Sequence, residues 1–256
     1  MDQESDKMNR FEDKVAFVTG AASGIGQATA VRLASEGAAL FIADINKAGL
    51  EETSKLCREH GAEVELHILD VSNEEQVNGA IQACVDHFGK LDVLCNIAGI
   101  LLLDHFEKTT VEQFHRVVNI NLLGTFMLCK AAMPHLIESG GNIINTSSTS
   151  ALGGAPYGAV YGASKGGVSA LTRGIAVEFA KQGIRCNSVV PGEVATNMTT
   201  GLDVPETLDF SIMGRQSPLT SPAPPEMLAS VIAMVASDDG AYMNGSEVRA
   251  DGGGLS

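Results

Sequence analysis

The sequence predicts an α/β fold in which one doubly wound parallel sheet lies between two layers of helices. Short, continuous apolar segments, typical of strands buried on both faces, alternate along the chain with segments whose apolar residues recur at helical spacing. The 256 residues include 28 glycines and no Trp, a composition typical of a globular chain with many backbone turns. Since no linker or repeat precedes Gly192, we expect a polar N-terminal tail over residues 1–13 and one domain over residues 14–256.

The first βαβ unit sets the pattern for the rest of the chain. The apolar run 15–18 predicts a strand that ends at a glycine-rich turn, residues 25–35 have helical spacing, and residues 38–43 predict a second strand. Further elements are expected in this order: a helix ending near 59, strand 64–71, helix 73–88, strand 91–95, helix 111–138, strand 142–145, helix 161–181, strand 185–190, helix 226–237 and strand 247–250. Strands that alternate with helices favour a parallel sheet.

Charge and cysteine usage exclude several classes of protein. With 17 Lys+Arg against 31 Asp+Glu, the net charge is −14, so nucleic acid and anionic membrane surfaces are poor partners. The charged N-terminus lacks the apolar core of a signal peptide, and no apolar run approaches the ~20 residues of a membrane span. The five cysteines form no C-x-x-C pair, and the six histidines lack metal-ligand spacing. We therefore expect a cytoplasmic protein without a bound metal, a nucleic-acid partner or a membrane anchor.

A glycine-rich loop, T-G-x-x-x-G-I-G over residues 19–26, connects the first strand to the first helix. Its backbone amides can approach a pyrophosphate at the helix N-terminus, although such a loop alone is equally well a tight turn. Asp44 ends the second strand, where its carboxylate can accept hydrogen bonds from the adenosine ribose or cap the next helix. Because the same charge repels a 2′-phosphate, NAD is favoured over NADP. Lys47, the nearest cation, opposes that preference.

Tyr161 and Lys165 lie four residues apart and therefore share one helix face. An isolated Y-x-x-x-K pair is most often a solvated helix surface, but here small residues flank the pair. Ser147 and Ser148 end the preceding strand at the carboxyl edge of the sheet, where open α/β sheets bind ligands. Since neighbours on a strand point to opposite sides, we expect Ser148 to face the site and Ser147 to face away.

The chain contains an ordered series of motifs over nearly its whole length: the loop 19–26, Asp70-Val71, Asn96-Ile97-Ala98-Gly99, Asn121, Ser148, Tyr161-x-x-x-Lys165, Pro191-Gly192 with Thr196, and Asp251-Gly252-Gly253. In this order they resemble the classical short-chain dehydrogenase/reductase family. The resemblance implies a Rossmann-type fold, a nicotinamide dinucleotide cofactor, a small alcohol or ketone substrate, and a homotetramer. Apolar residues that continue around the predicted helices 111–138 and 161–181 agree with an oligomer.

The resemblance also implies a catalytic set of Asn121, Ser148, Tyr161 and Lys165. Tyr161 would exchange a proton with the substrate oxygen, and Lys165 would lower the pKa of the phenol from ~10 by roughly 1 to 3 units. Ser148 would hydrogen-bond the reacting oxygen. By the same likeness, Lys165 would hold the nicotinamide ribose and Asn121 would position a water that links Lys165 to solvent.

Binding positions follow from the same resemblance. The expected cofactor-binding residues are Gly20, Ser23, Gly24, Ile25, Gly26, Asp44, Ile45, Asp70, Val71, Asn96, Ala98, Gly99, Tyr161, Lys165, Pro191, Gly192, Val194 and Thr196. The expected substrate pocket is Ser148, Tyr157, Tyr161 and Met198, with Tyr157 as a pocket wall. The sequence departs from the family pattern at Ile97, where a second Asn is common, and at Glu193, which faces either solvent or a polar substrate group.

Residues 193–225 hold five of the eight prolines and break the α/β alternation, which predicts a substrate lid. Within it, residues 198–213 include seven apolar residues, Met198, Leu202, Val204, Leu208, Phe210, Ile212 and Met213. Such a lid suits an apolar secondary alcohol or ketone of a hydroxysteroid-like, cyclic or aryl-alkyl kind, although packing against a neighbouring subunit explains it nearly as well.

The favoured function is therefore an NAD-dependent secondary alcohol dehydrogenase or ketone reductase with Tyr161 as general acid/base. One alternative is an NADPH-dependent 3-oxoacyl-[acyl-carrier-protein] reductase, which Asp44 and the acidic chain oppose. Another is a non-catalytic dinucleotide-sensing or scaffold protein on the same fold, which the intact catalytic set opposes.

Overall fold

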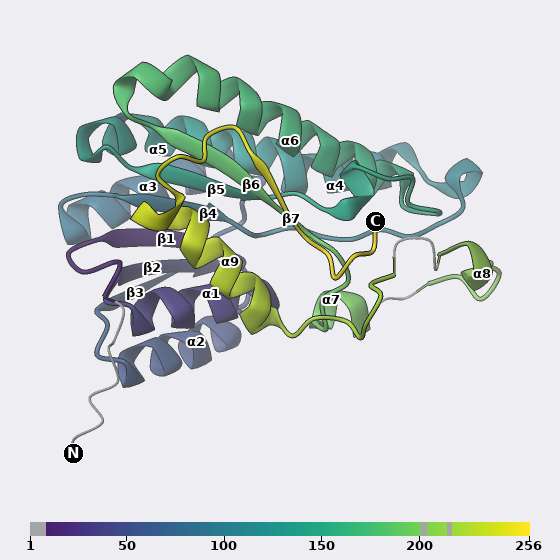
Figure 1. Cartoon of the computed structure of the whole chain (residues 1–256), viewed down its shortest axis with the longest axis horizontal. Coiled ribbons are helices and arrows are strands. Elements are labelled where there is room, and N and C mark those ends of the chain that lie inside the picture. The colour runs from purple at the N-terminus through teal and green to yellow at the C-terminus, as the bar shows by residue number, and fades with distance from the viewer. Residues whose placement is uncertain (1–8, 201–203, 214–216) are drawn as a thin grey trace.

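The centre of the molecule is a seven-stranded parallel sheet. The computed structural model describes residues 9–200, 204–213 and 217–256. The strands are β1 (Val15–Thr19), β2 (Ala39–Asp44), β3 (Val64–Ile68), β4 (Val93–Asn96), β5 (Asn142–Thr146), β6 (Arg185–Pro191) and β7 (Glu247–Ala250). Their order is β3-β2-β1-β4-β5-β6-β7, and all neighbours pair in parallel (Figure 1). The doubly wound α/β prediction is confirmed. Part of the predicted tail, residues 1–8, and Leu202 of the predicted lid lie outside the described residues.

Helices cover both faces of this sheet. They are α1 (Gly24–Ser35), α2 (Lys47–Glu59), α3 (Glu74–Phe88), α4 (Val111–Val118), α5 (Gly124–Ser139), α6 (Ala159–Phe179), α7 (Asn197–Thr200), α8 (Phe210–Met213) and α9 (Pro225–Ala236). In Figure 1, α1, α2 and α9 lie on one side of the sheet, and α3, α5 and α6 lie on the other. The predicted lid segment contains α7 and α8.

The alternation of side chains along each strand supplies both hydrophobic cores. In β1, Ala16 and Val18 pack with α1, α2 and α9, whereas Val15 and Phe17 pack with the α3 and α5 side. Successive strand residues point to opposite faces, so a strand covered on both sides must be apolar throughout. This explains why the short apolar runs of the sequence identified the central strands.

The strand order of the sheet reverses direction at β1. The chain builds outward from β1 to β3 and then returns to place β4 on the other side of β1. In open α/β sheets such a switch point leaves a crevice at the carboxyl ends of the strands, which is where ligands bind. The glycine-rich loop follows β1 and therefore lies at this crevice.

Most predicted bounds agree with the observed ones to within two residues, and two predicted elements differ by more than that or in helix type. The strand predicted over 64–71 ends at Ile68, because the Asp70 carboxylate accepts hydrogen bonds from the Ser72 amide (2.9 Å) and hydroxyl (2.6 Å) and turns the chain. The helix predicted over 111–138 is continuous, but a π-helical turn over Asn119–Leu123 separates α4 from α5. By length and composition alone the stretch Val111–Ser139 could cross a membrane, yet half of its apolar window is buried inside the protein, as in a core helix.

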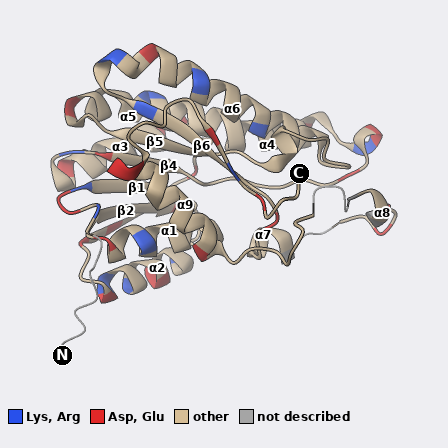
Figure 2. Cartoon of the chain, in the orientation of Figure 1, with Lys and Arg blue, Asp and Glu red and all other residues tan. Residues whose placement is uncertain are grey.

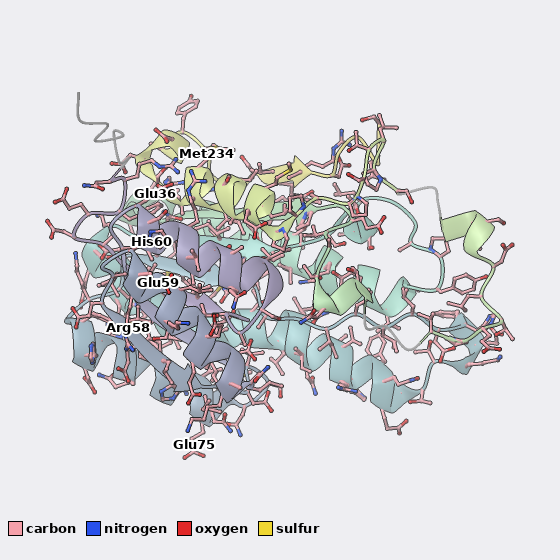
Figure 3. The ribbon with its side chains drawn as sticks, turned by 90° about the horizontal axis from the view of Figure 1, so that it is seen from below. Glu36, Arg58, Glu59, His60, Glu75 and Met234 are labelled. Carbon is pink, nitrogen blue, oxygen red and sulfur yellow. The ribbon has the colours of Figure 1, made fainter. Side chains whose placement is uncertain are left out.

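Ion pairs close the opposite end of the molecule. Glu36, labelled in Figure 3 at the end of α1, bonds Arg10 Nε at 2.6 Å and Arg32 Nε at 2.5 Å, and Arg10 also reaches Asp239 at 2.7 Å. Burial raises the pKa of Glu36, but the hydrogen bonds from the two guanidinium groups outweigh it and lower the pKa overall. Figure 2 shows many charged residues around this end and the outer helices, and none on α7.

Candidate active site

A cavity of about 640 Å³ lies along the carboxyl ends of the strands. It takes in the glycine-rich loop and the residues that follow β2, β3, β4, β5 and β6. Seventeen of the eighteen predicted cofactor positions line it: Gly20, Ser23, Gly24, Ile25, Gly26, Asp44, Ile45, Asp70, Val71, Ala98, Gly99, Tyr161, Lys165, Pro191, Gly192, Val194 and Thr196. Ser148 and Met198 line the same cavity. Its volume falls within the usual 300–1,000 Å³ of small-molecule and cofactor sites.

The glycine-rich loop has no room for side chains at two positions. A Cβ on Gly20, whose φ is +67°, would lie 2.9 Å from the backbone of Ala98, and one on Gly26 would lie 2.0 Å from the Gly20 carbonyl oxygen. Among the described residues, no side chain caps the N-terminus of α1 at Ser23. The first-turn amides are therefore available to an anion at the positive end of the helix dipole, so this loop fits a pyrophosphate.

Asp44 holds the loop and faces the cavity. Its Oδ2 accepts from the Ala22 amide at 3.2 Å and its Oδ1 accepts from the Asn46 amide at 2.9 Å. A carboxylate oxygen can accept more than one hydrogen bond, so capacity remains for ribose hydroxyls. Helix α2 is capped by Asn46 and not by Asp44. Lys47, the cation expected to oppose NAD, extends toward Glu51 at 3.8 Å.

Tyr161 and Lys165 lie in the first turns of α6, with the end of β5 beside them. Lys165 is buried, its Nζ donates to the Thr146 carbonyl at 2.7 Å, and it lies 5.9 Å from the centre of the Tyr161 ring. The Ser147 hydroxyl donates to the Lys165 carbonyl at 3.1 Å and is 2.9 Å from the Ser169 hydroxyl. Ser147 thus fastens α6 to β5, while Ser148 lines the cavity, as strand alternation predicts.

The expected lowering of the Tyr161 pKa by Lys165 is not found and needs correction. Burial raises the pKa of Tyr161, and a hydrogen bond with the Ser148 side chain opposes this only in part. Burial also lowers the pKa of Lys165, to about 8. Both shifts have one physical cause, since desolvation disfavours the charged form of each group. The degree of burial, which the sequence does not reveal, therefore decides the direction.

Asn121 is fully buried and does not line the cavity. Asn121 lies in the π-helical turn and contacts both the loop after β4 and helix α6. Its Nδ2 donates to the Ile100 carbonyl (2.9 Å) and to the Ser164 hydroxyl (3.1 Å), and its Oδ1 accepts from the Ile100 amide (2.8 Å). A Cβ on Gly99 would lie 3.1 Å from Asn121 Oδ1 and 3.4 Å from Lys165 Nζ. The amide and the ammonium group therefore approach the same point, and the water relay through Asn121 stays a prediction.

Asn96 is the one predicted cofactor position that does not line the cavity. It is buried at the end of β4, and its Nδ2 donates to Asn145 Oδ1 at 2.8 Å. Asn96 and Asn145 are register partners on adjacent strands, so the two amides meet inside the sheet. The next three residues, Ile97, Ala98 and Gly99, line the cavity instead.

Tyr157, predicted as a pocket wall, is absent from the cavity lining formed by the described residues. Its φ is +61°, a left-handed conformation that turns the side chain toward the lid. The phenol oxygen accepts from the Asp209 amide at 3.0 Å, and the ring packs edge-on against His105, which bonds Thr207 at 2.9 Å. Tyr157 and His105 therefore clasp the lid segment 204–213, whose α8 stands away from the sheet in Figure 1.

Several lining residues had not been predicted. They come from the loop after β4, from helix α4 and the π-helical turn after it, and from the loop after β5, and include Leu101, Leu103, Arg116, Ile120, Ala155 and Pro156. The apolar run 100–103 directly after the Asn96-to-Gly99 motif was a usable signal. Arg116 and Ile120 occur at an ordinary helical spacing, so the sequence held no signal for them.

The fold and this site define a dinucleotide-dependent oxidoreductase, and comparison with known proteins identifies its family. The profile of the family described as "Enoyl-(Acyl carrier protein) reductase" matches residues 20–254. The chain is 36% identical to meso-2,3-butanediol dehydrogenase of Serratia marcescens over 95% of each sequence, and 37% identical to 3-oxoacyl-[acyl-carrier-protein] reductase FabG of Thermotoga maritima over 95% of this chain and 98% of that one. A short-chain dehydrogenase from Mycobacterium paratuberculosis bound to NAD superposes with a TM-score of 0.89 at 30% identity, covering 96% of this chain and 98% of that chain. The chain belongs to the classical short-chain dehydrogenase/reductase family.

Proposed function

We propose that this protein is an NAD-dependent dehydrogenase that interconverts a secondary alcohol and a ketone, with Tyr161 as the general acid/base. The observation that carries the proposal is a single cavity that joins two groups of residues. The glycine-rich loop and Asp44 line one end, and Ser148, Tyr161 and buried Lys165 line the other. A protein that only senses a dinucleotide has no need for a phenol, a hydroxyl and an ammonium group beside the nicotinamide position.

The protein's own residues would manage the proton and the reacting oxygen. Tyr161 takes the hydroxyl proton of the alcohol during oxidation and returns it to the ketone oxygen during reduction. Ser148 hydrogen-bonds both the phenol and the reacting oxygen, and so holds them together. Lys165 would hold the nicotinamide ribose, and Asn121 would position a water behind it. The bound nicotinamide supplies the chemistry of hydride transfer.

Asp44 supports NAD over NADP. Asp44 lines the cavity at the end of β2, and no Lys or Arg forms an ion pair with it among the residues that the structure describes. A 2′-phosphate beside Asp44 would therefore meet uncompensated negative charge. For the 3-oxoacyl-[acyl-carrier-protein] reductase, the supporting observation is the similarity to such an enzyme, and the opposing ones are Asp44 and the net charge of −14.

The substrate body is proposed to be apolar, as in hydroxysteroid-like, cyclic or aryl-alkyl alcohols. Leu101, Leu103, Ala155, Pro156 and Met198 line the same cavity as Ser148 and Tyr161. Apolar walls with a few placed polar groups are typical of small-molecule sites. The enzyme is proposed to act in the cytoplasm, in agreement with five free cysteines.

A homotetramer is proposed for the assembly. Phe114 on α4 and Phe126 on α5 are each 43% exposed, and Val177 on α6 is 81% exposed, although the core takes up Val117, Leu128 and Val168 from the same helices. Exposed apolar side chains on neighbouring helices favour a subunit contact. Light scattering at micromolar concentration should give four times the monomer mass of 26.7 kDa, and a monomer would contradict the proposal.

The test of the proposed activity is the Tyr161→Phe variant, with Tyr242→Phe, a change at a fully exposed tyrosine, as the matched control. With NAD and a panel of secondary alcohols, Tyr161→Phe should lose about 10² to 10⁴ in kcat and still bind NADH. Wild-type oxidation should accelerate as the pH rises above 7, because burial raises the pKa of the phenol that must lose its proton. Turnover that survives in Tyr161→Phe rejects the mechanism, and preferential use of NADPH with a 3-oxoacyl thioester selects the alternative enzyme.

A further inference from the structure

The loop after β6 contains a carboxylate that the proposed chemistry does not use. Glu193 follows Gly192, lines the cavity and is exposed. Among the described residues its side chain has no hydrogen-bond partner and no ion pair, and the two cations that line the cavity, Arg116 and Lys165, form none with it. A free carboxylate in a cavity whose substrate walls are mostly apolar calls for a physical explanation.

The backbone around Glu193 is fixed on both sides. Its carbonyl accepts from the Ala223 amide at 3.0 Å, the Ala195 amide donates to the Ala223 carbonyl at 2.9 Å, and the Gly192 amide donates to the Ala250 carbonyl at 3.2 Å. Val194 forms a bridge with Ala223 and packs into the hydrophobic core. Because successive side chains of an extended segment point to opposite sides, Glu193 points away from the core. Its direction is therefore set by the fold.

Sheet order places Glu193 at the substrate end of the cavity. β6 adjoins β5, the strand that leads to Ser148, whereas β1, β4 and β5 separate it from β2, which carries Asp44. At ~4.8 Å per strand, the ends of β2 and β6 are about 19 Å apart. Among the described residues, the other carboxylates of the lining are Asp44, the last residue of β2, and Asp70, which follows β3. Of the three carboxylates in the described lining, Glu193 is thus the one at the substrate end.

We propose that Glu193 is a specificity-determining residue that selects secondary alcohols carrying a second hydrogen-bond donor, a hydroxyl or an ammonium group, near the reacting carbon. The inference rests on the proposed dehydrogenase function and narrows its substrate class. The carboxylate accepts a hydrogen bond from that donor and repels substrates with a carboxylate or phosphate at the same place. An apolar body then packs against Leu101 and Leu103, while the donor turns toward Glu193.

The test compares four secondary alcohols of similar size that differ in one substituent: 2-butanol, propane-1,2-diol, 1-aminopropan-2-ol and lactate. Wild-type kcat/KM should be higher for the diol and the amino alcohol than for lactate. In Glu193→Gln, the kcat/KM for lactate relative to that for 2-butanol should rise about tenfold. The kcat/KM for the amino alcohol relative to that for 2-butanol should fall by about the same factor. Glu193→Lys should reverse the order of lactate and the amino alcohol.

Two comparisons separate this proposal from protein damage and from failure of the proposed function. Glu206→Gln changes an exposed carboxylate of the lid segment that is outside the cavity lining, and it should leave all ratios within twofold. Calorimetric binding of isobutyrate and isopropylammonium to the NADH complex needs no turnover, and Glu193→Gln should tighten the first and weaken the second. If none of the alcohols reacts, the dehydrogenase proposal fails for this class while the binding data still judge Glu193. Equal or undetectable binding in both proteins, or unchanged ratios, overturns the inference.

Discussion

The two ends of the cavity are built from different kinds of structure. The cofactor end consists of strand termini and backbone: the glycine-rich loop after β1, Asp44 at the end of β2 and the amides of α1. The substrate end consists of loops joined by individual side chains, such as the Tyr157 hydroxyl on the Asp209 amide and His105 on Thr207. A ligand whose chemistry never varies can be bound by the sheet itself, whereas a variable ligand is bound by replaceable contacts.

This comparison explains where sequence motifs are strong and where they are weak. The backbone at the cofactor end permits only glycine at Gly20 and Gly26, so the residue types themselves reveal the site. The contacts that hold the lid segment at the substrate end depend on one hydroxyl, of Tyr157, and one imidazole, of His105, which come from separate loops. We expect large and general effects from changes at the first end, and small and selective effects from changes at the second.

The largest effect is expected at Gly26, where an added Cβ would meet the Gly20 carbonyl oxygen at 2.0 Å. Gly26→Ala should therefore displace the loop and weaken NADH binding more than about 100-fold, since a misplaced loop loses several hydrogen bonds to the cofactor at once. Gly174→Ala, in a helix with open space around the new Cβ, is the matched control and should gain stability. Fluorescence titration with NADH measures both variants. Retained affinity in Gly26→Ala would show that the cofactor end is less rigid than its geometry implies.

A change in stability is expected at Lys165, where the two ends meet. Burial lowers its pKa from 10.5 to about 8, and at ~1.4 kcal/mol per pKa unit the charged form destabilises the fold by about 3 kcal/mol at pH 7. Lys165→Met removes this term and leaves the Thr146 carbonyl without its donor, at a cost of ~1 to 3 kcal/mol. The variant should be inactive yet more stable by up to about 2 kcal/mol at pH 7.

The pH dependence gives the sign of this effect. Between pH 8 and 10.5 the unfolded chain holds the Lys165 proton and the folded protein does not, so wild-type stability rises with pH in that window. The advantage of Lys165→Met should therefore shrink above pH 8. Urea unfolding at pH 7 and pH 9.5 measures it, and an inactive variant that is less stable at both pH values would argue against a strained, buried ammonium group.

A smaller effect is expected at Asp44, where the proposed discrimination between NAD and NADP rests on charge and not on shape. Asp44→Asn keeps a side chain that can bond the Ala22 amide and removes the negative charge. NADPH affinity should rise about tenfold relative to NADH. Asp86→Asn, an exposed carboxylate on α3, provides the control. If the ratio of NADPH to NADH affinity is unchanged in Asp44→Asn, another residue of the cavity discriminates between the two cofactors.

The smallest effect is expected at the hydrogen bond between Tyr157 and the Asp209 amide. Tyr157→Phe deletes the phenol oxygen that accepts from the Asp209 amide and keeps the ring packed against His105. Losing one hydrogen bond of ~1 kcal/mol should change the KM for the alcohol about threefold to fivefold. The affinity for NADH should not move, and the Asp209 amide should exchange its proton faster. Equal losses in alcohol and NADH affinity would contradict the expectation that changes at the substrate end act selectively on the alcohol.

The sequence predicted most of the cofactor end because each requirement there is local. Apolar runs identified the strands, and the spacing of glycines, Asp44 and the Tyr161–Lys165 pair identified the lining. The errors concern what meets in three dimensions. Asn96 bonds Asn145 across the sheet, Tyr157 reaches Asp209 over 52 positions of sequence, and the Tyr161 pKa follows burial. Spacing along the chain carries no information about a partner from a distant segment or about exclusion of water.

The π-helical turn at Asn119–Leu123 bears on how such a site tolerates changes in chain length. One residue advances an α-helix by about 100°, so a deletion of Ile120 that restored a regular helix would rotate Asn121 away from Ile100 and Ser164. The shortened helix would gain regular hydrogen bonds and lose the contact behind Lys165. The extra residue of the π-helical turn thus costs helical regularity and sets the contacts that Asn121 makes beside Lys165.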